Sequence, residues 1–186
     1  MNKMLLTLAA VMTICFTACA QKQKEAKAEP AKTLIAYFSA TGNTAQAAQT
    51  LAEVTGGKLY AITPQDIYTA ADLDWHDKQS RSSVEMNNPQ ARPTLKETVS
   101  DMASYEVVFI GYPIWWNQAP RLINTFIESH DLKGKKLIPF ATSGGSSIDN
   151  SVEELKKAYP DLNWQNGKLL NRADKNTIQA WIDGLK

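Results

Sequence analysis

The sequence predicts an α/β fold in which helices cover both faces of a doubly wound parallel sheet of five strands. Apolar runs of strand length alternate with amphipathic stretches of helix length from residue 33 to residue 186. Strands buried on both faces are expected to be almost continuously apolar, as these runs are. The first run ends in a polar turn with a glycine, Ser39–Thr44, where a strand would lead into a helix. We therefore expect one domain of five β-α units.

Each element is expected from its own pattern. Strands are expected at Thr33–Phe38, Lys58–Ile62, Val107–Tyr112 and Lys136–Ala141, with a short fifth near Gly167–Leu170. Helices are expected at Thr44–Val54, Leu95–Met102, Pro120–Ile127, Asn150–Ala158 and Asp174–Leu185. Helical spacing is clearest in the last of these, because its apolar residues share one face: Ile178, Trp181, Ile182 and Leu185.

The turn after the first strand has the composition of a phosphate site. Its six residues are Ser39, Ala40, Thr41, Gly42, Asn43 and Thr44. A strand-to-helix turn presents free backbone N–H groups and the positive end of a helix dipole, and both favour a phosphate. The turn has no Lys or Arg, and it matches neither the nucleotide triphosphate loop nor the dinucleotide fingerprint. It therefore suits a single terminal phosphate monoester, and the alternative is an ordinary polar turn with a helix cap.

Two further turns at the same edge of the sheet have the residues of ligand loops. In doubly wound sheets ligands bind outside the carboxyl ends of the strands. The third strand is followed by two adjacent flat aromatic faces in the run Pro113, Ile114, Trp115, Trp116 and Asn117. The fourth is followed by small residues with hydroxyls, Thr142, Ser143, Gly144 and Gly145. The alternative for the tryptophans is that they close the core beneath the loop.

One connection is unusually long. Residues 63–93 are polar and leave the second strand at the edge that carries the phosphate turn. We interpret them either as an insertion near the ligand or as a solvated surface excursion. In the first case the residues that could cover the ligand are Tyr68, Trp75, His76 and Arg81. The two histidines, His76 and His130, have no metal-ligand spacing and are expected at the surface.

The amino-terminal segment is expected to be an export signal. Residues 1–19 have an early Lys3, an apolar run too short to span a bilayer, and small residues before Cys19. This pattern predicts a bacterial lipoprotein whose mature form begins at lipidated Cys19, and the alternative is a plain secretory signal. Residues 20–32 have the composition of a flexible tether before a domain at 33–186.

Composition narrows the chemistry of that domain. The only cysteines are Cys15 and Cys19, so the domain has no disulfide, thiolate metal site or dithiol redox pair. The formal net charge of +1 gives no nucleic-acid footprint. Any redox chemistry must therefore come from a bound cofactor. We expect the exported protein to contact the membrane through its lipid anchor alone, and to lie in the periplasm or at the outer membrane.

With these three turns in place, the chain resembles the flavodoxin family, in the branch with a Pro-Ile-Trp-Trp loop. The family's Ser/Thr-x-Thr-Gly-Asn-Thr pattern is matched in full by residues 39–44. The resemblance covers nearly all of residues 33–186 and implies strand order 2-1-3-4-5 with FMN as cofactor. It also implies that Trp115 or Trp116 stacks on the flavin, and that residues 142–145 line the polar edge of the ring.

Three features depart from the family pattern. Asn117 stands where flavodoxins commonly have glycine, the net charge is near neutral instead of strongly acidic, and the chain carries an export signal. The expected function is an envelope-anchored FMN protein that relays electrons to a redox partner protein or a quinone-like small molecule. The alternatives are an FMN-dependent quinone or nitro reductase and a flavin-free binding lipoprotein. We expect no catalytic side chain and no metal ligand.

Overall fold

The strand order of the sheet is that of a doubly wound fold. A computed structural model describes residues 32–172 and 174–185. Its sheet has the order β2-β1-β3-β4-β5, with β6 also paired to β4. This confirms the fold class and the order implied by the resemblance. The expected signal, its Cys19 and nearly all of the expected tether lie outside the described residues.

Four strands match their expected positions closely. They are β1 (Thr33–Tyr37), β2 (Lys58–Ala61), β3 (Val107–Pro113) and β4 (Lys136–Thr142), and every neighbouring pair is parallel. The middles of β1, β3 and β4 are buried, as continuous apolar runs predict.

The fifth position of the sheet is divided between two short strands. The prediction of one strand near Gly167–Leu170 was incomplete, because β5 (Asn163–Trp164) and β6 (Lys168–Leu169) both pair with β4. Between them Gly167 passes so close to α4 (Asp149–Ala158) that an added Cβ would lie 2.9 Å from Ile148. The close approach of this helix accompanies the break between the two strands.

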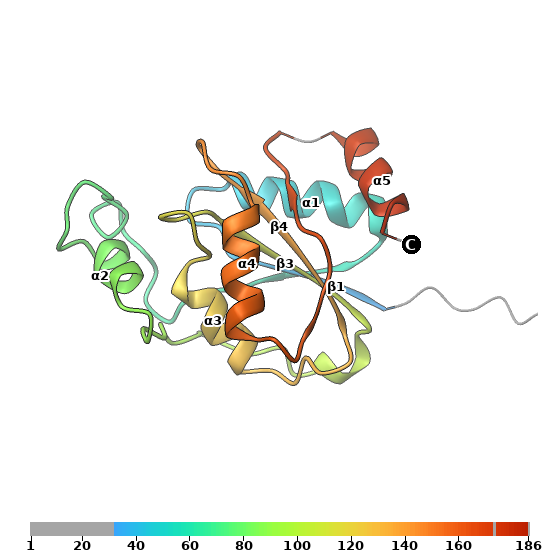
Figure 1. Cartoon of the computed structure of the whole chain (residues 1–186), viewed down its shortest axis with the longest axis horizontal. Coiled ribbons are helices and arrows are strands. Elements are labelled where there is room, and N and C mark those ends of the chain that lie inside the picture. Colours follow the sequence, from blue (N-terminus) through green and yellow to red (C-terminus); the bar gives the residue numbers. More distant parts are fainter. Residues whose placement is uncertain (1–31, 173, 186) are drawn as a thin grey trace, which may run out of the picture.

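Helices cover the two faces of the sheet in pairs (Figure 1). Helices α1 (Asn43–Thr55) and α5 (Lys175–Asp183) pack into one apolar cluster, around Ile35 and Phe109. Helices α3 (Arg121–Glu128) and α4 pack into the other, around Leu34 and Ile110. The apolar face expected for the last helix, with Ile178, Trp181, Ile182 and Leu185, is therefore the face that meets the sheet.

One expected helix is absent from the described part of the chain. The segment Leu95–Met102 forms no α-helix, and only a short 3-10 helix, Met102–Ser104, begins at its end. Val99 and Met102 are buried all the same, although the segment consists of bends and turns. Here Lys96 donates its N–H to the carbonyl of Thr63 at 2.9 Å, so pairing with a distant segment replaces helical bonding.

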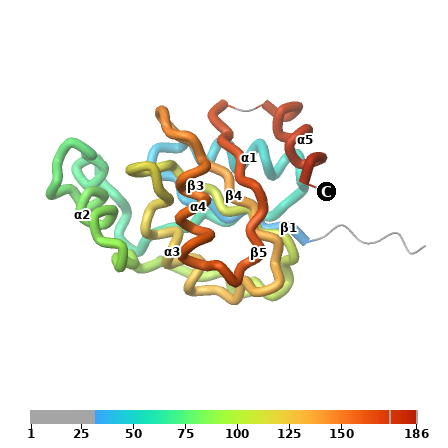
Figure 2. The backbone as a smooth tube through the Cα atoms, viewed as in Figure 1, coloured from blue at the N-terminus to red at the C-terminus, as the bar shows by residue number. Residues whose placement is uncertain are grey.

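The long connection is an ordered excursion that extends away from the sheet (Figures 1 and 2). It contains a short helix, α2 (Arg81–Asn87), whose cap Ser80 accepts a hydrogen bond from the N–H of Ser83. The two ends of the excursion are joined by a hydrogen bond, in which the N–H of Gln65 donates to the carbonyl of Thr94 at 2.7 Å. The excursion is therefore a folded part of the domain.

The two histidines differ in their surroundings. His76 is exposed, as expected. His130 is half-buried, contrary to expectation. Its Nε2 accepts the N–H of Val99 at 2.8 Å and its Nδ1 lies 2.7 Å from the carbonyl of Phe126.

Among the described residues no group of three or more His, Cys, Asp or Glu side chains could hold a metal ion. Within the same residues no helix is long and apolar enough to span a bilayer.

Candidate functional site

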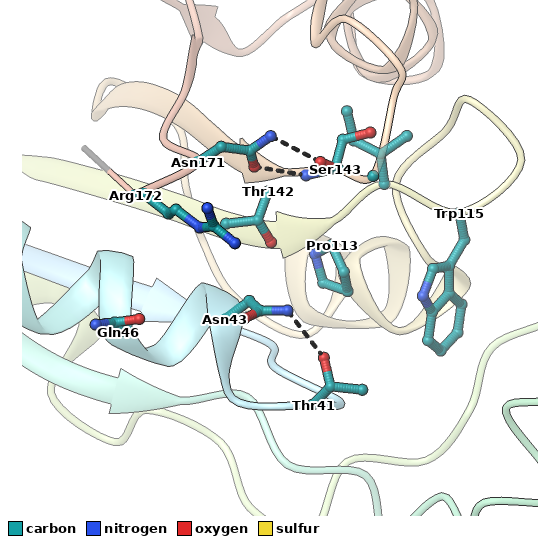
Figure 3. Close-up of a pocket in the computed structure, with 11 residues that line it drawn as sticks. Thr41, Asn43, Gln46, Pro113, Trp115, Thr142, Ser143, Asn171 and Arg172 are labelled. Atoms are coloured by element: carbon teal, nitrogen blue, oxygen red, sulfur yellow. Dashed lines mark hydrogen bonds between the residues drawn. The ribbon is translucent and has the colours of Figure 1, made fainter.

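The three predicted turns meet in one cavity of about 570 Å³ at the carboxyl edge of the sheet (Figure 3). This volume lies within the range of small-molecule sites. We call it the polar cavity. The predicted residues that line it are Thr41, Asn43, Pro113, Ile114, Trp115, Thr142, Ser143 and Gly144. The structure therefore brings together members of all three turns, which lie about a hundred residues apart at the extremes.

The first turn is organised to present backbone donors. Gly42 caps α1 with a left-handed φ of 92°, a conformation that glycine adopts without steric cost. The hydroxyl of Ser39 accepts the N–H groups of Gly42 and Ala45, each at 3.1 Å. Within the described part of the chain, no hydrogen bond occupies the N–H groups of Thr41, Asn43 and Thr44. Three free donors at a helix N-terminus form a favourable anion site.

The remaining residues of the first turn support it from outside the polar cavity. The hydroxyl of Thr44 is buried and lies 2.8 Å from that of Thr142, which ties the first turn to the end of β4. Ser39, Ala40 and Gly42 line a smaller hollow of about 300 Å³ on the side of β2. The Thr44 side chain therefore fixes the turn, and its backbone N–H is the group that remains for a ligand.

The two tryptophans have different environments. Trp115 is half-buried and packs edge-on against Phe38 and Tyr68, with ring centroids 5.5 and 5.4 Å away. Trp116 is 43% exposed. The backbones of Trp116 and Asn117 have positive φ, 45° and 62°, in a tight turn closed by Trp115 and Gln118. Asn117 thus adopts a left-handed conformation, which Asn reaches at lower cost than most residues.

A second cavity, also of about 570 Å³, adjoins the first. We call it the apolar cavity. It shares Ile114, Trp115, Ser143 and Gly144 with the polar cavity, and its other walls are Leu73, Trp75, Ser82, Trp116, Gly145 and Ser146. The two cavities meet at Trp115, which lies at the opposite end of the polar cavity from Arg172 in Figure 3. A ligand with a charged tail and a flat ring fits this combination.

Three lining residues were missed by sequence reasoning: Gln46, Asn171 and Arg172. Among the described residues that line the polar cavity, Arg172 alone is charged. Asn171 accepts the N–H of Ser143 at 2.9 Å and donates to its carbonyl at 2.7 Å, which holds the fourth turn in place. Asn171 and Arg172 follow the last strand, so the rule applied to the other turns would have found them.

The insertion supports Trp115 from behind. The hydroxyl of Tyr68 donates to Glu85 at 2.5 Å, and Arg81 binds the same carboxylate at 2.6 Å while its guanidinium lies 4.1 Å from the Tyr68 ring. Burial, together with the hydrogen bond to Glu85, raises the pKa of Tyr68 well above its usual range, so the phenol stays protonated and keeps donating. Of the expected cover residues, Tyr68 and Arg81 therefore act as a support.

The other two expected cover residues lie farther out on the insertion. Trp75 is 66% exposed and lines the apolar cavity. His76 packs against Trp75, with ring centroids 3.5 Å apart. The insertion thus contributes directly to one wall of the candidate site.

Comparisons with known proteins agree with this geometry. The model of a family described as flavodoxin matches residues 32–185. A curated flavodoxin from Maridesulfovibrio salexigens is 26% identical over 167 residues, which cover 83% of this chain and 96% of that protein. A solved structure of a candidate flavoprotein from Bacteroides eggerthii is 62% identical with a TM-score of 0.82, covering 83% of this chain and 98% of that one.

A more distant structure carries a ligand. It is a flavoprotein in complex with FMN from Lactobacillus acidophilus, 20% identical with a TM-score of 0.65, covering 83% of this chain and 98% of that one. At this identity the likeness concerns the fold.

Proposed function

Because the chain belongs to the flavodoxin family, we propose that it is an electron-transfer flavoprotein with FMN as its cofactor. The observation that carries this proposal is the junction of the two cavities. Free backbone N–H groups and Arg172 lie in the polar cavity, while the indole of Trp115 lines both cavities. FMN has a terminal phosphate that suits the polar cavity and a flat ring that suits the apolar cavity. The family and the FMN-bound relative from Lactobacillus acidophilus support the same cofactor.

Each part of the site has a defined role toward FMN. The N–H groups of residues 41, 43 and 44 and the hydroxyl of Thr41 bind the phosphate, and Arg172 balances its charge. Trp115 provides the aromatic face for the ring. Ser143 and Gly144 lie on the wall that both cavities share and meet the polar edge of the ring. The bound flavin supplies the redox chemistry, and these residues bind and orient it.

The side chains of the site suit an electron carrier better than an enzyme that needs a catalytic acid or base among its own residues. Among the described residues that line the two cavities, none is a His, Cys, Asp or Glu, so the two cavities offer no imidazole, thiol or carboxylate for acid–base catalysis. Bound FMN should therefore take up and release electrons reversibly in an anaerobic titration with dithionite and ferricyanide. Sustained oxidation of NADH or NADPH by the FMN-loaded protein would show that the protein is a reductase and not an electron carrier.

We expect Thr41→Ala to weaken FMN binding by about 1–3 kcal/mol, because a hydrogen bond to a charged phosphate is lost. Fluorescence titration with FMN and with riboflavin measures this, and riboflavin affinity should stay unchanged because riboflavin has no phosphate. Thr50→Ala is the matched control, since the Thr50 hydroxyl bonds within α1 to the carbonyl of Gln46. An equal loss for both ligands would remove Thr41 from the phosphate site.

The protein is proposed to work in the cell envelope. The support is the short apolar run that ends in small residues before Cys19. Labelled palmitate should be incorporated into the full chain expressed in a bacterium and recovered with the membrane fraction. Cys19→Ser should abolish the label and Cys15→Ser should not. If the wild-type protein incorporated no palmitate, the proposed lipid anchor would be wrong, whereas the proposed FMN site would be unaffected.

A further inference from the structure

Another cavity, of about 450 Å³, lies outside the candidate site. Its walls come from α3 and the two residues before its cap, from α4 with the following Tyr159, and from the end of the insertion at residues 89, 90 and 92. We call it the helix cavity. It shares no lining residue with the polar cavity or the apolar cavity. A molecule bound in it would therefore be separate from FMN.

The helix cavity contains a guanidinium with an unused donor. Arg121 is the first residue of α3, and its Nη2 donates to the carbonyl of Met86 at 3.0 Å. The Nε of Arg121 is buried and has no hydrogen-bond acceptor among the described residues. A buried donor without an acceptor is costly. An acceptor supplied by a ligand would remove this cost.

The other charged side chains of the lining already have partners. Arg92 binds both carboxylate oxygens of Glu128, at 2.8 and 2.9 Å. Glu154 lies 3.1 Å from Lys157. No ion pair found between described residues includes Arg121. The helix cavity therefore offers one unpaired positive charge, and its two carboxylates oppose a second negative charge on a ligand.

The environment of Arg121 favours an anion with a single charge. Burial and the charge of Arg92 lower the pKa of Arg121, and an anion beside the guanidinium would offset both effects. A carboxylate matches the planar donors of a guanidinium. A dianionic phosphate would bring two charges to one available cation.

The remaining walls suit hydroxyl groups. The amide side chains of Gln90, Gln118 and Asn124 line the helix cavity. Each amide has both donor and acceptor atoms, and a hydroxyl can use either.

We propose that the helix cavity binds a small monocarboxylate that carries hydroxyl groups, of the sugar-acid class. The Nε–H of Arg121 donates to the carboxylate, and the amides of Gln90, Gln118 and Asn124 meet the hydroxyls. Because the cavities share no lining residue, the sugar acid and FMN bind at the same time.

The test is a titration of the purified protein with gluconate, with and without FMN, followed through the arginine Nε–H signals in ¹H–¹⁵N NMR spectra. The signal of Arg121 is the one absent from Arg121→Lys, since lysine has no such group. It should shift saturably with gluconate. Glucitol has the same carbon chain with hydroxyls but no carboxylate, and it should leave this signal almost unchanged.

Calorimetry measures the contribution of the guanidinium. Arg121→Gln should weaken gluconate binding by about 10-fold or more, because a charge-assisted hydrogen bond is lost. Lys78→Gln is the matched control, since it also removes one positive charge, from an exposed residue that does not line the helix cavity.

Three outcomes would overturn the inference: no saturable shift of the Arg121 signal, equal responses to gluconate and glucitol, or equal gluconate affinity in wild type and Arg121→Gln. Tighter binding of inorganic phosphate than of gluconate at the Arg121 signal would also contradict the proposed class of ligand. Gluconate binding by a protein that does not bind FMN would refute the proposed function alone.

Discussion

Replacing Gly111 with alanine is expected to lower the free energy of unfolding by about 3 kcal/mol, because the core has no space for the added methyl group. Gly111 lies in β3 directly beside Phe140 of β4. A Cβ at this position would overlap the Phe140 ring, which is completely buried. The ring cannot move aside without disturbing the close-packed cluster formed with α1 and α5.

Urea unfolding followed by circular dichroism measures this effect. Gly145→Ala is the matched control, since nothing lies within 4 Å of its added Cβ. The double variant Gly111→Ala/Phe140→Leu should recover part of the loss, because the smaller side chain makes room for the methyl group. A Gly111→Ala protein within about 0.5 kcal/mol of wild type would show that β3 and β4 pack less tightly than described.

The second large effect is expected at Trp115. Trp115→Ala should raise the dissociation constant for FMN about 30-fold, a loss of about 2 kcal/mol, because it removes the aromatic wall common to both cavities. The same change should destabilise the protein by about 2 kcal/mol, since Trp115 packs against Phe38 and Tyr68. Trp116→Ala should leave the free energy of unfolding within about 0.5 kcal/mol of the wild-type value, because Trp116 is 43% exposed and is less buried than Trp115.

Flavin fluorescence titration and urea unfolding separate these two effects. Trp115→Phe should restore much of the stability and part of the FMN affinity, since it keeps a smaller aromatic face. Unchanged FMN affinity in Trp115→Ala, with a large loss in Trp116→Ala, would transfer the stacking role to Trp116. A loss of stability without any loss of FMN affinity in either variant would remove both tryptophans from the cofactor site.

Much of the fold was predictable because local pattern and burial agree in it. The runs that form β1, β3 and β4 are apolar because both faces of each strand are covered. The segment Leu95–Met102 was predicted wrongly because its apolar spacing suits a helix, whereas its backbone is bonded to the start of the insertion. Long-range pairing of this kind leaves no periodic signal in a single sequence.

The candidate site was predictable where the chain changes from strand to helix. Thr41, Asn43 and Ser143 line the polar cavity because parallel strands bring their carboxyl ends to one edge. Arg172 was missed although it follows the strand expected near Gly167–Leu170, because the rule was applied only to the turns after the first, third and fourth strands. The support of Trp115 by Tyr68 was not predictable, because it depends on a contact between the start of the insertion and the loop after β3.

The most direct test of the central claim is a fluorescence titration of the purified protein with FMN and with riboflavin. The account predicts tight, quenched binding of FMN and much weaker binding of riboflavin, because the turn at residues 41–44 binds the phosphate while Trp115 meets the ring. Equal affinity for the two ligands would contradict the phosphate site. Absence of binding to either would contradict the assignment of this chain as an FMN carrier.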